Sequence, residues 1–353
     1  MEYPPGALPV FLPPYAFGAS HYNAAFKVLM ALCGVATLVV VALLLVRLGA
    51  RAARVWTGVL LFALAPIALG PISLNTYDAW PALLTAAALA LLLAALPVAA
   101  LALLGLAFAA KVYPVVLLPP ALIFAWRTAG RSAALRGLGA FAGIAAVVIL
   151  PFLVLAPHGL SQSFHAQAAR SLQVESLGGS LLGAADRLGW YSATVVHHTE
   201  HAVSYDLVGS LPRALAAVSS IGQILAVVAV AWLYGGGRDE PQRLALAFAA
   251  AVAGFLAFTR FFSPQYLVWL LPFVVLLRPL QWVLVATALV LAQSWFFHYG
   301  NVFRLGGTIL LVLLRDVLVV ALFVSVVVAL RRRAVKEEDP VLLEDQAPVG
   351  VPP

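Results

Sequence analysis

Carboxylates stand beside apolar runs at three points of the sequence. Asp78 lies in LNTYDAWP, Glu175 lies in RSLQVESLGGS, and Glu2 lies in EYPPG near the first residue. A carboxylate beside a bound hydroxyl group can accept its proton while the oxygen attacks an electrophile. These three are therefore the candidate catalytic bases, and an ordinary helix N-terminal charge is the alternative for Asp78.

Three cations have a similar placement. Lys111 lies in AAKVYP, Arg170 lies in QAARSLQ, and Arg260 lies in FTRFFSPQYLVW. Lysine binds a phosphate as a point charge and arginine binds it with a planar fork, so these residues predict a phosphate-binding site. The other candidate substrate-binding residues are Tyr113, His165, Gln173, Gln265 and Tyr266. The alternatives are snorkelling anchors for Lys111 and Arg260, and an interfacial aromatic belt for Tyr266 and Trp269.

Histidines concentrate between residues 157 and 210, where five of the seven occur. They are His158, His165, His197, His198 and His201. The run HHTEH lacks the spacing of the helical HExxH zinc motif, and its Ser and Thr neighbours favour a solvated loop. We therefore expect no metal and no cofactor. His165 differs, because it precedes Arg170 on a stretch that predicts an amphipathic interfacial helix.

The composition excludes a soluble domain. Hydrophobic residues make up 63% and charged residues 10% of the 353-residue chain, with a mean hydropathy of +1.02, whereas soluble domains carry about 25% charged residues. Runs of about 20 apolar residues cross membranes as helices. The apolar runs of this chain lack the two-residue alternation of a membrane barrel. The net charge of +7 comes mostly from basic residues between the runs, which indicates membrane topology rather than nucleic-acid binding.

We predict an all-α fold, a polytopic bundle of about eleven transmembrane helices over residues 1–330, followed by a disordered cytoplasmic tail over 331–353. The predicted spans are 25–46, 55–72, 79–95, 97–110, 112–126, 137–156, 211–234, 243–259, 264–278, 281–297 and 307–330. Residues 1–20 predict an interfacial or re-entrant segment without a signal peptide, and 157–210 predicts one long loop. Because adjacent residues do not face one another on a helix, we expect Arg315 and Asp316 to pair with other helices or to lie near the outer edge of the last span.

Basic residues predict the orientation in the membrane. Of the 21 Lys and Arg residues, thirteen fall on the side that holds Arg47, Arg51 and Arg54, and six fall on the other side. An excess of basic residues marks the cytoplasmic face. The N-terminus, the 157–210 loop and the candidate site are then extracytoplasmic, and the C-terminus is cytoplasmic. The candidate residues lie at the outer ends of helices, where they can meet in one cavity.

Five motifs, in order between residue 2 and about residue 330, resemble the GT-C membrane glycosyltransferases. They are EYPPGALPVF, TYDAWPALLTAAALALLL, AAKVYPVVLLPP, RSLQVESLGGSLL and FSPQYLVWLLP, and they look most like glycosyltransferase family 87, the polyprenol-phosphate-mannose-dependent mannosyltransferases. The resemblance implies a multi-span fold with an extracytoplasmic site. It also implies an inverting transfer of a sugar, with mannose expected, from a polyprenyl phosphate to a lipid or glycan acceptor of the cell envelope.

The chain departs from the family pattern at its start. In the family, the EYPP-like segment follows a first span and a loop that carries the catalytic aspartate, whereas one residue precedes Glu2 here. We interpret this start as mis-called or truncated, so the catalytic base stays unassigned. A catalytically inactive homologue and a lipid or solute transporter are the alternatives. Transporters bind their substrates near the bilayer midplane, whereas the charges of this chain lie at the outer helix ends.

Overall fold

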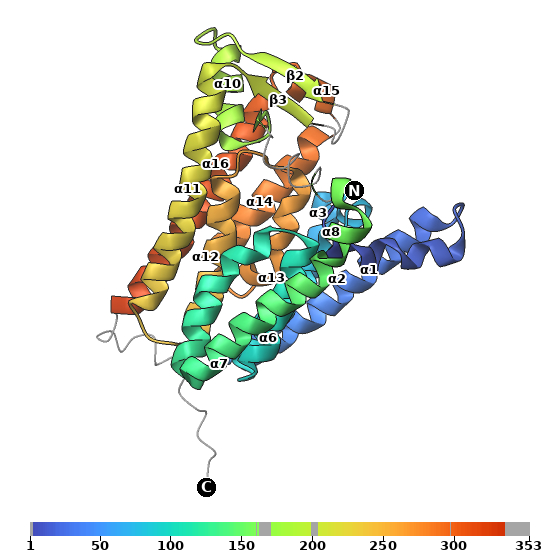
Figure 1. The fold of residues 1–353 in the computed structure, drawn as a ribbon. Helices are drawn as coiled ribbons and strands as arrows, with labels where there is room; N and C mark the ends of the chain where they lie inside the picture. The colour runs from blue at the N-terminus through green and yellow to red at the C-terminus, as the bar shows by residue number, and fades with distance from the viewer. Residues whose placement is uncertain (1–2, 160, 162–170, 199–203, 297, 336–353) are drawn as a thin grey trace.

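The chain folds into a bundle of apolar helices with a small cap at one end (Figure 1). The computed structural model describes residues 3–159, 161, 171–198, 204–296 and 298–335. Within these residues, five helical segments are long and apolar enough to cross a membrane. They contain α2 (Tyr22–Arg47), α3 (Ala52–Leu69), α7 (Leu118–Ile149), α11 (Ser210–Gly235) and α16 (Ile309–Val335). The predicted polytopic helical membrane bundle is therefore confirmed.

Shorter helices complete the bundle. The longer of these are α5 (Ala79–Leu93), α6 (Pro97–Ala110), α12 (Pro241–Ala257) and α14 (Pro279–Phe296). Nearly every residue of α12 is buried, because this Ala-rich helix packs against α16, α11 and α7 in the interior. The small alanine side chains of this helix let its neighbours approach closely. α12 is thus the centre of the bundle.

Short helical turns connect these elements at several places. They are η1 (Pro5–Ala7), α1 (Leu8–Phe11), η2 (Pro13–Phe17), α4 (Ile72–Asn75), η3 (Tyr113–Leu117), α8 (Pro151–Leu155), η4 (Pro264–Trp269), α13 (Leu271–Val274) and α15 (Tyr299–Phe303). The proline-rich start packs into the bundle at η1, where Pro5, Gly6 and Ala7 are all buried. Gly6 lies so close to the backbone of α6 that an added Cβ atom would stand 2.4 Å from Ala109.

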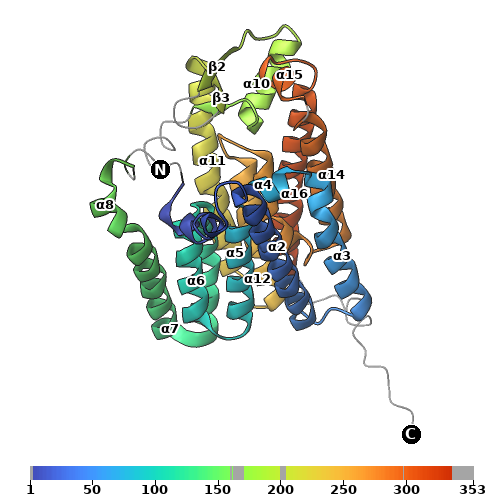
Figure 2. The same cartoon turned by 90° about the vertical axis from the view of Figure 1, so that its right-hand side faces the viewer.

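Most of the eleven predicted spans correspond to helices, and the segment 264–278 is the exception. The spans 112–126 and 137–156 fall on the two legs of α7, which Gly130 separates with a φ of 83° and a ψ of 167°. Figures 1 and 2 show the chain reversing there, at the end of the bundle opposite the cap. The segment 264–278 is not a regular span, because it consists of the 3-10 turn η4 and the four-residue α13. Prolines at 264 and 272 remove backbone donors and break the helix.

The cap contains a small sheet, which lies within the stretch that was predicted as one long loop. β1 (Leu172–Gln173), β3 (Ser204–Val208) and β2 (Thr194–His198) form an antiparallel sheet in that order. α10 (Leu177–Arg187) follows β1, and the Ser176 hydroxyl caps it by accepting from Gly179 N at 3.2 Å. Figure 2 shows this cap standing at one end of the bundle, above α11 and α16.

Two predictions for the 157–210 segment need correction or fall outside the described residues. His197 and His198 lie in β2, opposite Tyr205 and Ser204, rather than in a solvated loop. The β-branched residues that precede them in TVVHH favour a strand. His201 lies outside the described residues, as does the predicted tail beyond residue 335.

Candidate functional site

A buried ion pair joins the start of α5 to the end of α6. Lys111 is the C-terminal capping residue of α6, and its extended backbone (φ −159°, ψ 146°) ends the helix. Its ammonium lies 2.5 Å from Oδ1 of Asp78, the residue that precedes α5. The same Oδ1 accepts a hydrogen bond from Nε1 of Trp269, in η4, at 2.6 Å. Three segments that are distant in the sequence therefore meet at one carboxylate.

Aromatic rings surround the ammonium of Lys111. Its Nζ atom lies 4.6 Å from the ring centroid of Tyr77, 5.0 Å from that of Tyr266 and 4.9 Å from that of Trp269. Rings at this distance attract a cation through their electron-rich faces. The Lys111 side chain keeps 15% of its surface exposed, whereas that of Asp78 keeps 2%. The ammonium is thus held in a defined place with some access from outside.

The aromatic residues of this site stack on one another inside the protein. Trp269 lies between Tyr113 and Tyr266, with ring centroids 4.1 Å and 4.2 Å away and nearly parallel planes. The Tyr113 hydroxyl also shares a hydrogen bond of 3.2 Å with the hydroxyl of Thr85. Tyr266 and Trp269 are buried, so the alternative of an interfacial aromatic belt for these two residues was wrong. η4 follows the central helix α12 in the chain, and four of its residues are buried: Pro264, Tyr266, Leu267 and Trp269.

A second polar cluster lies where the cap meets α16. Glu175, between β1 and α10, is 3% exposed, and its Oε2 accepts from Nε2 of Gln173 at 3.0 Å. The hydroxyl of Tyr299 approaches Oε1 at 3.5 Å, and the guanidinium of Arg315 donates to the main-chain oxygen of Glu175 at 2.7 Å. Burial raises the pKa of Glu175 to about 8, and Arg315 opposes this shift. Burial therefore favours the protonated form of Glu175.

Arg315 and Asp316 contact other segments, as expected, and they also form an ion pair with each other, which was not expected. Nε of Arg315 lies 2.8 Å from Oδ1 of Asp316. Oδ2 of Asp316 accepts from the hydroxyl of Ser180, on α10, at 2.6 Å. The pair is fully buried and joins α16 to the cap.

The two clusters are connected through the segment before η4. The guanidinium of Arg315 lies 3.9 Å from the ring centroid of Phe262, and the Phe262 ring stacks on Tyr266 at 6.3 Å. The main-chain nitrogen of Gln173 donates to the main-chain oxygen of Arg260 at 2.9 Å. The cap, the end of α12 and the stacked rings beside Lys111 thus form one packed unit.

The predicted site residues that the structure describes fall mainly into two sets. The first set meets at the ion pair and consists of Asp78, Lys111, Tyr113 and Tyr266. The second set lies at the base of the cap and consists of Gln173, Glu175 and Arg260. Gln265 is half-buried on η4, beside the first set in the sequence. Glu2, His165 and Arg170 lie outside the described residues.

The prediction missed several residues that the site contains. Tyr77 forms one side of the ring enclosure around Lys111, and Tyr299 and Arg315 contact Glu175. Tyr77 directly precedes Asp78 in the sequence, so its neighbourhood could have indicated it. Arg315 is a charge within an apolar run, which usually marks a buried partner or a functional role. Its contact with Glu175 joins residues 140 positions apart, and no local pattern shows such a separation.

Comparison with known proteins places this chain among glycosyltransferases. The profile of glycosyltransferase family 87 matches residues 2–264, which is well over half of the chain. A search of the curated proteins gives no match. Among solved structures, the chain is similar to ArnT from Cupriavidus metallidurans bound to undecaprenyl phosphate, with 17% identity, a TM-score of 0.45, and coverage of 98% of this chain and 69% of that chain. The family match confirms the resemblance of the five motifs: the chain belongs to glycosyltransferase family 87.

Proposed function

We propose that this protein transfers a mannosyl group from a polyprenyl-phosphate donor to an extracytoplasmic acceptor of the cell envelope, with inversion, and that Lys111 binds the donor phosphate. Membership of family 87 supplies the reaction class. The observation that carries the assignment is the Lys111 ammonium, which Asp78 orients at 2.5 Å and three aromatic rings enclose. A cation in this setting is already positioned before a ligand arrives, so little ordering is needed on binding.

A cation beside the phosphate favours the transition state over the bound donor. A sugar joined to polyprenyl phosphate is a phosphodiester, and it gains negative charge on the phosphate when the bond from sugar C1 to the phosphate oxygen breaks. Lys111 would interact more strongly with this developing charge than with the intact diester, and only such differential binding accelerates the reaction. Its half-enclosed surroundings strengthen the interaction, because they contain less water than bulk solvent.

The proposed transfer is a single displacement at carbon C1 of the sugar. The acceptor hydroxyl oxygen attacks C1 from the face opposite the phosphate, the C1–oxygen bond breaks, and polyprenyl phosphate leaves with the bonding electrons. The hydroxyl proton passes to a carboxylate. Asp78 and Glu175 are both buried, and each already accepts hydrogen bonds within the protein. We therefore assign them positioning roles, Asp78 for Lys111 and Glu175 for the cap, and do not assign either as the base.

The proposal places the site at the extracytoplasmic face and the C-terminus in the cytoplasm, with the polyprenyl chain among the helices. The supporting observation is the distribution of basic residues. Arg331 and Arg332, at the end of α16, lie at the opposite end of this helix from the cap. Such basic ends favour the cytoplasmic side of a membrane.

A transfer assay with a matched control tests the assignment. The purified protein in lipid nanodiscs receives radiolabelled polyprenyl-phosphate mannose and an extract of envelope lipids, and labelled product and bound donor are measured. We expect Lys111→Ala to lower transfer by about 100-fold or more, as for loss of one charge-stabilising donor. Lys27→Ala, which removes an exposed lysine of α2, should keep the wild-type rate. Absence of transfer with any common polyprenyl-phosphate sugar, together with unchanged donor binding by Lys111→Ala, would refute the proposal.

A further inference from the structure

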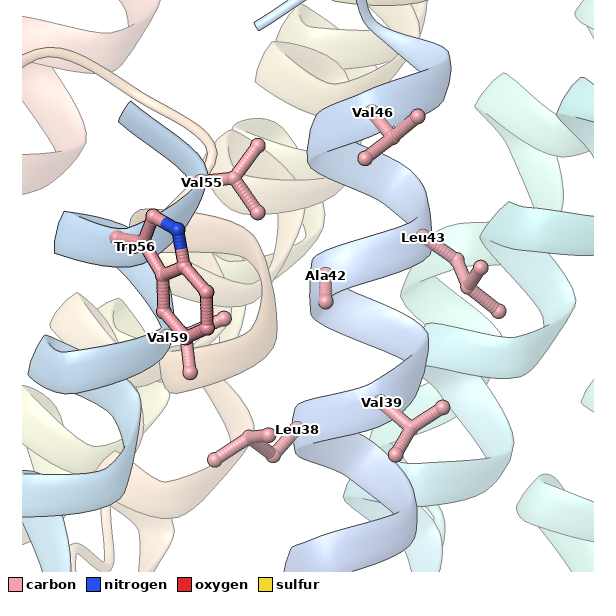
Figure 3. A pocket seen from close by; sticks show the side chains of 8 residues that line it. All are labelled: Leu38, Val39, Ala42, Leu43, Val46, Val55, Trp56 and Val59. Carbon is pink, nitrogen blue, oxygen red and sulfur yellow. The ribbon is translucent and has the colours of Figure 1, made fainter. Parts of the chain in front are cut away.

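An apolar groove runs between α2 and α3 on the outer surface of the bundle (Figure 3). It has a volume of about 330 Å³ and is lined by Leu38, Val39, Ala42, Leu43, Val46, Val55, Trp56 and Val59. Trp56 is 67% exposed and Val46 is 62% exposed. Both helices are long enough to cross a membrane, so these side chains face the hydrocarbon of the bilayer rather than water.

Positive charge lies at the end of the groove where α2 turns into α3. Arg47 ends α2 and Arg51 precedes α3, and both are exposed. Arg47 uses its Nε atom to donate to the main-chain oxygen of Leu93 at 2.7 Å, while its side chain stays exposed. Arg54 donates to the main-chain oxygens of Val275 and Leu277 at 2.6 Å and 2.5 Å. Between residues 3 and 77 the sequence contains no Asp or Glu. These two helices therefore supply cations to the end of the groove and no carboxylate.

One carboxylate from another segment approaches this end. The side chain of Gln242 donates to the main-chain oxygen of Leu48 at 3.2 Å, which brings the neighbouring Glu240 to the same end of the bundle. Asp239, the residue before Glu240, pairs with Arg127 at 3.3 Å. The two exposed arginines therefore exceed the charge of Glu240 and leave an excess of positive charge at this end. The groove is apolar along its length and cationic at one end, so it is complementary to an acyl chain that is joined to an anionic headgroup.

We propose that the groove binds one acyl chain of an anionic phospholipid whose phosphate lies beside Arg47 and Arg51. The helical rise of 1.5 Å per residue makes the α2 wall from Leu38 to Val46 about 12 Å long, which accommodates the upper part of an acyl chain. Trp56 lies near the charged end, at the depth where tryptophan contacts the lipid headgroup region. This site contains none of the residues of the Lys111 cluster, so it does not depend on the proposed function.

Fluorescence quenching by brominated lipids tests the proposal. The full-length protein is reconstituted in phosphatidylcholine vesicles with a small fraction of brominated phosphatidylglycerol or of brominated phosphatidylcholine. The difference in emission between the wild type and Trp56→Phe isolates the signal of the groove. Each basic residue near an anionic surface gives a preference of about five-fold, and Glu240 offsets part of it. We expect the brominated anionic lipid to quench Trp56 at an at least about five-fold lower mole fraction than the neutral lipid.

Three variants separate the headgroup contact from the acyl-chain contact. Replacing Arg47 and Arg51 with Gln should remove the preference for the anionic lipid, whereas Arg131→Gln, which changes an exposed arginine of α7, should keep it. Ala42→Phe fills the groove and should reduce quenching by both lipids, whereas Val35→Phe adds the same ring to an exposed position of α2 outside the groove. Equal quenching by the two lipids in the wild-type protein would overturn the proposal, because it would mean ordinary contact with bulk lipid only.

Discussion

Breaking the Asp78–Lys111 pair should destabilise the protein strongly, and removing both charges should restore most of the loss. The pair is 2.5 Å long, with side-chain exposures of 2% for Asp78 and 15% for Lys111. Removing one partner of a buried pair costs about 3–5 kcal/mol because the other charge stays buried. Lys111→Met leaves the Asp78 carboxylate with its hydrogen bond from Trp269 Nε1, so we expect about 3 kcal/mol.

The reverse change should cost less. In Asp78→Asn the ammonium of Lys111 stays within three aromatic rings, each of which contributes about 0.5–1 kcal/mol, so we expect a loss of about 2 kcal/mol. The double variant keeps neither charge and should lose only about 1 kcal/mol, because replacing both partners of a buried pair leaves no unpaired charge in the interior.

Reversible unfolding by sodium dodecyl sulfate in mixed micelles measures all three variants. The expected values give a coupling energy of roughly 4 kcal/mol between the two positions, well above the error of such cycles. Additive losses in the double variant, or single losses below about 0.5 kcal/mol, would show that the two charges are separated by solvent in the membrane-embedded protein. The role of Asp78 in orienting Lys111 would then be refuted.

Three further predictions concern the cap and the N-terminal segment. Burial raises the pKa of Glu175 to about 8, so the folded state holds the proton more tightly than the unfolded state. The free energy of unfolding should therefore fall as the pH rises from about 5 to 8. Glu175→Gln should remove this fall, which unfolding titrations at several pH values measure. Gly6→Ala should lower the unfolding free energy by about 1–3 kcal/mol, because the new Cβ atom would stand 2.4 Å from the α6 backbone, whereas Gly34→Ala, with open space around it, should not. Ser176→Ala removes the cap on Gly179 N and should cost about 1 kcal/mol in the same assay.

Hydropathy predicted the membrane helices well because apolar length is a local property of the sequence. The reversal at Gly130 lies between two spans that were predicted separately, and glycine accommodates its positive φ. The run 264–278 has the hydropathy of a span, but Pro264 and Pro272 break it into turns. Hydropathy averages over these prolines, so only attention to backbone donors could have shown that this segment is irregular.

The cap sheet was missed for a different reason. β1 has two residues, and β2 and β3 have five each, so each strand is too short to give a long alternating pattern. The β-branched residues of TVVHH were a usable signal, but two histidines after them suggested a polar loop instead. Pairing with β3 determines the structure of this segment, and its register depends on residues that lie beyond the segment itself.

The sequence indicated which residues belong to the candidate site, but not which of them contact one another. Asp78, Lys111 and Tyr266 were identified because charges and aromatics stood at the ends of apolar runs. The same reasoning gave equal weight to Glu175, which is adjacent to none of them and instead holds the cap on α16. Sequence patterns cannot separate these roles, since both carboxylates precede helices and both are buried. What distinguishes them is the charged group nearby: a lysine with some access from outside for Asp78, and the fully buried Arg315 for Glu175. The exposed part of Lys111 is open to a ligand while the protein stays folded, and this exposure is the physical reason to centre the proposed transfer site on Lys111.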